Sequence, residues 1–317
     1  MHCEMTRIIS VFIISISLFS CSKERRSDKA AEKMQDFVIN ISGYARGIDP
    51  DFIIIPQNGI ELSFNNIDVN EGQDTRFMNA IDGIGVEELF YNGDYALDAE
   101  RLSMLQQLKV SGKIMVSEFV SDNGNIEDAY SRNYDEGFIC FTRNSGNYDY
   151  LEIPENVPQE NTADIANLSL AKNYLYIIST DKYSTKSELL NAISATNFDA
   201  VIIDLFFEGT AFTSSEINQL KTKTNGGKRL VISYINIGSA ENFRYYWKDN
   251  WGLHHPLWLK KKYDGYDDEF WVKFWKNDWQ DIIYGNDNSY MKKIIDAGFD
   301  GAYLDNVEAY YFLYYKE

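Results

Sequence analysis

The chain alternates between short, almost continuously apolar runs and longer segments with helical periodicity. Each run ends in polar or turn-forming residues. This pattern is typical of strands buried on both faces of a parallel sheet. The runs cover residues 52–56, 81–86, 113–119, 138–141, 174–178, 200–205, 229–235 and 302–304. Most begin roughly 30 residues after the previous run, the length of one strand–helix–strand unit.

Helical signals fill the gaps between these runs. Thr185 and Thr213 each stand three residues before a glutamate, as in a capping box. Asn288 or Ser289 can cap a helix that ends at Gly298. Strands that alternate with helices predict an α/β fold, and eight of them predict a (β/α)8 barrel of the TIM type.

The two ends of the chain suggest how this barrel closes. Residues 30–45 carry apolar side chains at helical spacing, and Asp49-Pro50 ends that helix. Only a stub of helix can follow Asp305, because twelve residues remain. We therefore expect the N-terminal helix to fill the gap between the last strand and the first.

The first residues have the pattern of a bacterial lipoprotein signal. Arg7 precedes an apolar run over residues 8–19, which is shorter than the ~20 residues of a membrane span. Residues 18–21 resemble a lipobox in which Cys21 is acylated; the alternative is an ordinary secretory signal. We expect a signal peptide over residues 1–20, a tether over 21–29 and one barrel domain over 30–317. In that case the protein contacts the membrane only through its lipid anchor, and we expect it at the cell envelope.

The composition narrows the class of ligand. The net charge is −18, which argues against nucleic acid and suits a cationic or neutral ligand. The sequence has no glycine-rich phosphate loop after the first strand and no Gly-x-Ser-x-Gly elbow, so we expect no cofactor. His254 and His255 are neighbours with no third histidine or cysteine near them, so we expect no metal.

Several short motifs resemble glycoside hydrolase family 114, which includes endo-α-1,4-polygalactosaminidases. Residues 232–244 are similar to its Tyr-(x)3-Gly-Ser-x-Glu stretch, and residues 305–310 to its Asp-Asn-Val-acid motif. The later landmarks of the family resemble residues 56–59, 85–90 and 116–119, which come earlier in this chain. That order is similar to a circularly permuted bacterial and archaeal branch, once labelled cysteinyl-tRNA-synthetase-related. The resemblance implies a permuted TIM barrel and a polysaccharide substrate.

Glycoside hydrolysis requires two carboxyl groups, one protonated and one ionised, on either side of the scissile bond. Asp305 follows the eighth strand and Glu87 the second, and the first strand lies between them in a closed barrel. With strands ~4.8 Å apart, two inward-leaning acids can flank one bond. The resemblance favours Asp305 as the nucleophile and Glu87 as the acid/base. If the predicted ends of these strands are off by one residue, Glu88 or Glu308 is the catalytic acid in place of its neighbour.

Other polar residues stand at or near the ends of predicted strands. We expect these to bind sugar hydroxyl groups: Asn58, Glu118, Asp204, Tyr234 and Asn306. Asp204 is alternatively an internal polar contact. Arg244 is expected to hold its loop to Glu241 rather than to contact substrate. The six tryptophans all lie between residues 247 and 279, where they either stack on sugars or form a small core of their own.

Three functions fit these observations. The first is a lipid-anchored glycoside hydrolase that cleaves an α-linked polysaccharide, for which the resemblance suggests one that contains galactosamine. The second is a non-catalytic carbohydrate-binding lipoprotein on the same barrel, which is favoured if the two carboxyl groups point apart or are separated by more than about 10 Å. The third is a scaffold without a ligand, which requires that the tryptophan-rich insertion plug the mouth of the barrel.

Overall fold

The computed structural model describes the backbone of residues 3–315 and the side chains of residues 23–315. Within these limits each of the eight predicted strands is present, with ends that differ from the predicted ones by a few residues. They are β1 (Ile53–Pro56), β2 (Gly83–Tyr95), β3 (Lys113–Val120), β4 (Ile139–Arg143), β5 (Tyr174–Tyr176), β6 (Ala200–Asp204), β9 (Leu230–Asn236) and β13 (Gly301–Asp305). Almost every residue of β1, β4, β5, β6, β9 and β13 is buried, as continuous apolar runs require.

The strands form two parallel sheets. One has the order β1-β13-β9-β6-β5 and the other the order β2-β3-β4. The predicted α/β class with parallel sheets is therefore confirmed. The last strand, β13, pairs with the first, β1, in the register Ile53 to Gly301 and Pro56 to Leu304. Chain order and spatial order thus agree, and the two ends of the strand series are neighbours.

Two seams separate the sheets. At the first, the Asp82 amide donates to the Ile54 carbonyl at 2.9 Å and the Asn58 amide to the Gly85 carbonyl at 2.7 Å. β1 and β2 are therefore joined by single backbone bonds rather than by a full ladder. Between β4 and β5 no ladder occurs in the described chain, and the rings of Phe141 and Tyr174 pack there at 5.9 Å.

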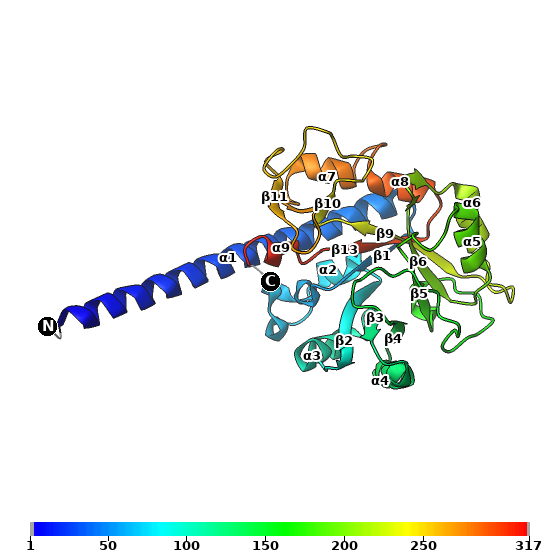
Figure 1. Ribbon diagram of the computed structural model, residues 1–317, viewed down its shortest axis with the longest axis horizontal. Coiled ribbons are helices and arrows are strands. Elements are labelled where there is room, and N and C mark those ends of the chain that lie inside the picture. The colour runs from blue at the N-terminus through cyan, green and yellow to red at the C-terminus, as the bar shows by residue number, and fades with distance from the viewer. Residues whose placement is uncertain (1–2, 316–317) are drawn as a thin grey trace.

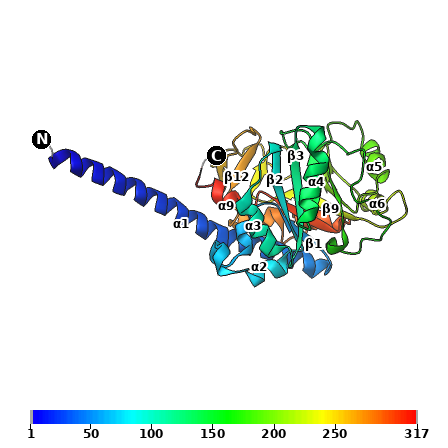
Figure 2. The same ribbon diagram turned by 90° about the horizontal axis from the view of Figure 1, so that it is seen from below.

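Helices cover the outside of these strands (Figures 1 and 2). They are α2 (Thr75–Ala80), α3 (Ala99–Leu108), α4 (Ile126–Asp135), α5 (Lys186–Ser194), α6 (Ser214–Leu220), α7 (Asn277–Ile283), α8 (Tyr290–Asp296) and α9 (Ala309–Phe312). The predicted capping box at Thr213 is present with both of its bonds. Gly298 follows α8 with φ 85°, the left-handed conformation expected beyond a helix end.

Helix α1 (Cys3–Ile48) is longer than the predicted helix 30–45. The apolar side chains of its predicted segment are buried, including Met34, Phe37 and Ile41. The Gln35 amide donates to the Leu62 carbonyl at 2.8 Å, and Phe37 stacks on Phe274 at 6.1 Å. α1 therefore packs between the segment that follows β1 and the insertion that precedes β13.

The N-terminal part of α1 projects from the globular body in both views (Figures 1 and 2). Residues 21–29, predicted as a tether, belong to this helix, and Ser27 donates to the Tyr310 carbonyl at 3.2 Å. The side chain of Cys21 lies outside the described residues, as do those of the predicted signal peptide. In the described part of the chain, no helix has an apolar stretch long enough to cross a bilayer.

The segment between β9 and β13 forms an insertion with its own small sheet. It contains β10 (Ser239–Glu241), β11 (Leu259–Lys262) and β12 (Glu269–Val272), in the order β10-β12-β11. Its tryptophans pack on one another: Trp251 lies 5.0 Å from Trp258, which lies 5.2 Å from Trp279. Of the two alternatives for these rings, the structure supports a small core of the insertion.

Candidate active site

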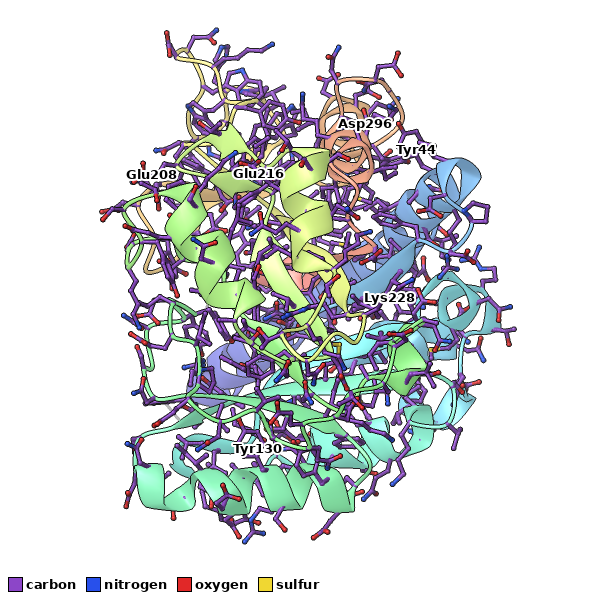
Figure 3. All side chains as sticks on the ribbon, turned by 90° about the vertical axis from the view of Figure 1, so that its right-hand side faces the viewer. Tyr44, Tyr130, Glu208, Glu216, Lys228 and Asp296 are labelled. Atoms are coloured by element: carbon purple, nitrogen blue, oxygen red, sulfur yellow. The ribbon has the colours of Figure 1, made fainter. Side chains whose placement is uncertain are left out.

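A cavity of about 630 Å³ opens where β5, β6 and β9 end. Its lining includes Asp204, the last residue of β6, and Tyr234, near the end of β9, so the cavity is at the C-terminal ends of the strands. Figure 3 shows Glu208 of this lining at the left edge of the molecule, and Lys228, before the start of β9, away from it to the right. The C-terminal end is the one at which α/β barrels carry their chemistry. Its aromatic lining consists of Tyr148, Phe206, Tyr234, Phe243, Tyr245 and Tyr266, and its acidic lining of Asp149, Asp181, Asp204, Glu208 and Glu241. Arg244 is the one basic residue of this lining as described.

Asp305 is the last residue of β13 and lies beside this cavity. The Tyr234 hydroxyl, which belongs to the cavity wall, donates to Asp305 Oδ2 at 2.6 Å. The backbone amide of Asn306 donates to Asp305 Oδ1 at 2.7 Å. Burial, and after it the negative charge of Glu87, raises the pKa of Asp305 from 3.8 to about 7. Asp305 therefore holds a proton through much of the neutral range, as a general acid must.

Glu87 lies on β2 at a bulge. The register of β2 against β3 shifts between Glu87 and Asn92, and Glu88 has φ 54°. Such a bulge re-aims side chains and ends regular pairing. Arg101 of α3 supports the bulge by donating to the Glu87 carbonyl at 2.8 Å and to the Glu88 carbonyl at 2.6 Å.

Both oxygens of the Glu87 carboxylate accept hydrogen bonds. Asn58 donates to Oε2 at 3.2 Å, and the Tyr150 hydroxyl donates to Oε1 at 2.5 Å. Asn58 also accepts a bond from the Glu87 amide at 3.1 Å. Asn58, which we expected to bind sugar, therefore contacts the proposed second acid.

The structure thus brings together the two proposed acids. β1 lies between their strands, paired with β13 and bridged to β2. The charge of Glu87 acts on Asp305, so the two groups share one electrostatic environment. Of the neighbouring acids, Glu88 forms an ion pair with Arg143. Glu308 is partly buried, and burial followed by the charge of Glu61 raises its pKa to about 8.

Asp204 and Tyr234 both line the cavity, as expected of substrate-binding residues. Asp204 also forms an ion pair with Arg244, with 2.7 Å between Asp204 Oδ2 and Arg244 Nη1. Arg244 Nε donates to Glu241 at 2.7 Å, so the predicted link between these two residues is confirmed. The alternative that Asp204 is an internal polar contact is consistent with its exposed fraction of 8%.

Glu118 has a different environment from the one we expected. Its side chain has an exposed fraction of 0% and accepts bonds from the Phe90 amide at 3.1 Å and from Asn133 at 2.9 Å. Burial raises its pKa. A sugar outside the fold does not reach this carboxyl, which instead supports the backbone of β2 beyond the bulge.

Asn306 connects Asp305 to the insertion. It has φ 59°, a left-handed conformation that asparagine tolerates. The side-chain amide of Asn306 donates to Ser239 Oγ at 3.2 Å and to Glu269 Oε1 at 3.3 Å. Burial, followed by the charge of Glu241, raises the pKa of Glu269 to about 8. Asn306 therefore has a structural role next to the acid, rather than a position on the cavity wall.

Sequence reasoning missed three residues of this site: Tyr150, Tyr266 and Glu269. Tyr266 comes from the insertion, lines the cavity and donates to the Asn147 carbonyl at 3.4 Å across it. None of the three follows a strand that an apolar run predicts, and each lies in a polar segment without a recognisable motif. Across residues 23–315, no group of three or more histidine, cysteine or acidic residues is arranged to hold a metal ion.

Residues 157–316 match the family model described as glycoside-hydrolase family GH114. The chain belongs to this family. The match to GH114 includes Asp204, Tyr234, Asp305 and Asn306, and it begins after Glu87. Family membership therefore covers the half of the site that carries Asp305, whereas Glu87 comes from residues outside the matched range.

The GH114 chain is also similar to three curated proteins, each of which is named only as uncharacterized. It is 32% identical to one of Thermotoga maritima over 118 residues, which are 37% of this chain and 35% of the relative. It is 33% identical to one of Methanocaldococcus jannaschii over 153 residues, 47% of this chain and 41% of the relative. It is 32% identical to one of Deinococcus radiodurans over 122 residues, which are 38% of this chain and 37% of the relative. The matches thus span about two fifths or less of these relatives.

Proposed function

We propose that this GH114 protein hydrolyses an α-linked polysaccharide with Asp305 and Glu87 as its two carboxyl groups. The observation that carries the proposal is the placement of this pair. Asp305 ends β13 and Glu87 lies on β2, on either side of β1. Asn58 and Tyr150 each donate a hydrogen bond to Glu87, and burial raises the pKa of Asp305 to about 7. Glycoside hydrolysis requires two carboxyl groups that flank one bond.

Two assignments of the roles follow from this pair. The raised pKa of Asp305 favours Asp305 as the acid, which makes Glu87 the nucleophile or base. The family resemblance gives the opposite roles. A 5-fluoro glycosyl fluoride accumulates on the nucleophile of a retaining enzyme. The labelled peptide, identified by mass spectrometry, distinguishes residues 301–305 from residues 83–95.

The fold that supports this site is proposed as one (β/α)8 barrel with a circularly permuted strand order. The proposal is supported by the pairing of β13 with β1 and by the bridge between β1 and β2. It is also supported by the family match, which begins before β5 and omits the strands of Asn58 and Glu87. Amide exchange tests the closure: β1 amides that exchange far faster than those of β9 would contradict a closed barrel.

The lining of the cavity suggests a polymer rich in amino sugars. Aromatic rings such as those of Phe243 and Tyr245 are exposed and can stack on sugar faces. The acids Asp149, Asp181 and Glu208 can attract protonated amines, and the chain as a whole is acidic. A galactosamine polymer combines both features. The scaffold hypothesis required a plugged mouth, and the open cavity of about 630 Å³ does not fit it.

The decisive experiment incubates the full chain with de-N-acetylated polygalactosamine, with its N-acetylated form and with a neutral α-1,4-glucan. Reducing ends are expected with the first polymer and not with the glucan. Asp305→Asn and Glu87→Gln are expected to abolish their release. Asp296→Asn, which removes an exposed acid of α8 outside the cavity, keeps turnover. Binding without cleavage by the unmodified protein would support the carbohydrate-binding alternative, and neither binding nor cleavage of any polymer would overturn both.

We also propose that the protein is lipid-anchored at the cell envelope through Cys21. The support is the sequence of residues 7–21, with its basic start, apolar run and terminal cysteine. An alkyne-bearing fatty acid supplied to expressing cells should label the unmodified chain and not the Cys21→Ser variant. Equal labelling of both would rule out this anchor.

A further inference from the structure

Tyr150 lies in the loop between β4 and β5 and contacts Glu87 through its hydroxyl. The hydroxyl donates to Glu87 Oε1 at 2.5 Å and accepts a bond from Ser117 Oγ at 3.0 Å. Ser117 stands opposite Glu87 in the register of β2 and β3. The side chain of Glu87 is thus held from one direction by Asn58 and from another by a serine–tyrosine pair.

The conformation of Tyr150 indicates that this contact is maintained against a local cost. Its φ is 41°, a left-handed value that is unusual for an aromatic residue. Strained backbone persists where the surrounding structure enforces it, and such residues concentrate at functional sites. Here the enforcing contacts are clear. The Ile178 amide donates to the Tyr150 carbonyl at 3.0 Å, and the ring stacks on Tyr176 at 3.9 Å.

The phenol of Tyr150 remains a donor under ordinary conditions. The side chain is 3% exposed. Burial, and after it the charge of Glu87, raises the pKa of the phenol well above its usual value. The hydroxyl therefore keeps its proton and donates a hydrogen bond to the carboxylate, while its oxygen accepts the hydrogen bond from Ser117.

We propose that Tyr150 is a positioning residue that fixes the orientation of the Glu87 carboxylate for catalysis. This inference rests on the proposed function and assigns a role that neither the motifs nor the family match contains. Tyr150 is not among the residues that line the cavity, so its effect acts through Glu87 rather than on the sugar. Removing the hydroxyl leaves the carboxylate with Asn58 as its one side-chain donor, on Oε2, and Oε1 is no longer held in place.

Other groups that face Glu87 set the background for this effect. Arg143 from β4, Asp305 from β13 and Glu308 beyond it are the ionisable groups that interact with its charge. The phenols of Tyr148, Tyr176, Tyr266 and Tyr303 also interact with that charge. Arg143 also interacts with the Tyr150 hydroxyl, so Tyr150→Phe removes the contacts of that hydroxyl with both Glu87 and Arg143 and leaves the other groups in place.

The test compares two phenylalanine variants of adjacent, equally buried tyrosines. Tyr150→Phe loses the bond to Glu87, whereas Tyr176→Phe loses a bond of 3.1 Å to Gln57 Oε1. Tyr150→Phe is expected to lower kcat about 10- to 100-fold with little change in KM, because a hydrogen bond to a charged group is lost. The pH–rate profile of Tyr150→Phe should also change. Tyr176→Phe should keep the kcat and the pH–rate profile of the unmodified chain.

Each outcome has a separate meaning. Inactive Glu87→Gln together with a Tyr150→Phe variant of unchanged kcat and pH profile would overturn this inference and leave the proposed function intact. An active Glu87→Gln variant would remove both. A lower yield or melting temperature of Tyr150→Phe with an unchanged pH–rate profile would mean a purely structural role and would also overturn it. Ser117→Ala, which removes only the bond to the phenol oxygen, should lower kcat by a smaller factor than Tyr150→Phe.

Discussion

Replacing Asp305 with asparagine should stabilise the fold at alkaline pH while it abolishes hydrolysis. The change keeps the shape of the side chain. The amide oxygen can still accept from the Asn306 amide, and the amide nitrogen can donate to the Tyr234 hydroxyl, which then acts as the acceptor. What disappears is a buried charge, since Asp305 ionises near pH 7 in the folded chain and near pH 3.8 when unfolded.

The magnitude follows from this difference in pKa. A rise from 3.8 to about 7, at 1.36 kcal/mol per pKa unit, means that ionised Asp305 lowers the free energy of unfolding by about 4 kcal/mol at most. The sign is set by proton binding. Between the two pKa values the folded state holds more protons than the unfolded state, so stability is full below pH 3.8 and is lost as pH rises through 7. Because Asp305 is partly open to solvent, we expect a gain of roughly 2–4 kcal/mol for Asp305→Asn at pH 8.

Urea unfolding followed by tryptophan fluorescence measures this gain. The tryptophans lie in the insertion that packs against the body, so their emission reports loss of the fold. The difference between Asp305→Asn and the unmodified chain should be larger at pH 8 than at pH 5. Asp181→Asn, at an exposed acid of the same cavity, should show no such difference. If Asp305→Asn and the unmodified chain lose stability equally between pH 5 and pH 8, the buried-acid reasoning is wrong.

Two further predictions concern the core. A Cβ on Gly85 would lie 1.9 Å from the Tyr303 hydroxyl, so Gly85→Ala should destabilise the fold by about 1–3 kcal/mol and reduce hydrolysis by displacing β2. The matched change Gly43→Ala, at an exposed helical position with open space, should be neutral or stabilising in the same thermal melts; equal losses would contradict the clash. Lys223 and Asp199 form an ion pair at 2.9 Å with both side chains 0% exposed. Lys223→Met should lower the free energy of unfolding by roughly 3–5 kcal/mol in urea titrations, and a midpoint shift no larger than that of a surface lysine variant would refute this.

The strands were predictable because parallel strands with both faces buried require continuous apolar runs. Each of the eight runs became a strand, and the small deviations at their ends reflect turns. The exception is β2, which extends to Tyr95 rather than ending near residue 86. The bulge at Glu87 and Glu88 lets polar residues continue a strand, and bulges leave no periodic signal in a sequence.

The site was predictable in part. Asp305 and Glu87 were placed near the carboxyl ends of their strands because each acid follows an apolar run, and the family motifs paired them; their catalytic roles stay a prediction. Glu118 was expected there for the same reason, yet its carboxyl turns inward to the amides of Phe90 and Tyr91. Neighbouring side chains of a strand point to opposite faces. The sequence therefore predicts that a residue lies at the end of its strand, but not which way its side chain points.

The amino-acid order alone was enough to establish a parallel α/β protein and its acid-bearing strand ends, because apolar periodicity and helix caps are local properties of the chain. It did not indicate that a tyrosine from a polar loop would hold Glu87, or that the tryptophans would pack together instead of lining the cavity. Those outcomes depend on contacts between residues such as Tyr150 and Glu87, which are 63 positions apart. Only packing of the complete fold brings such residues within reach, and only burial of Asp305 beside another acid changes its pKa.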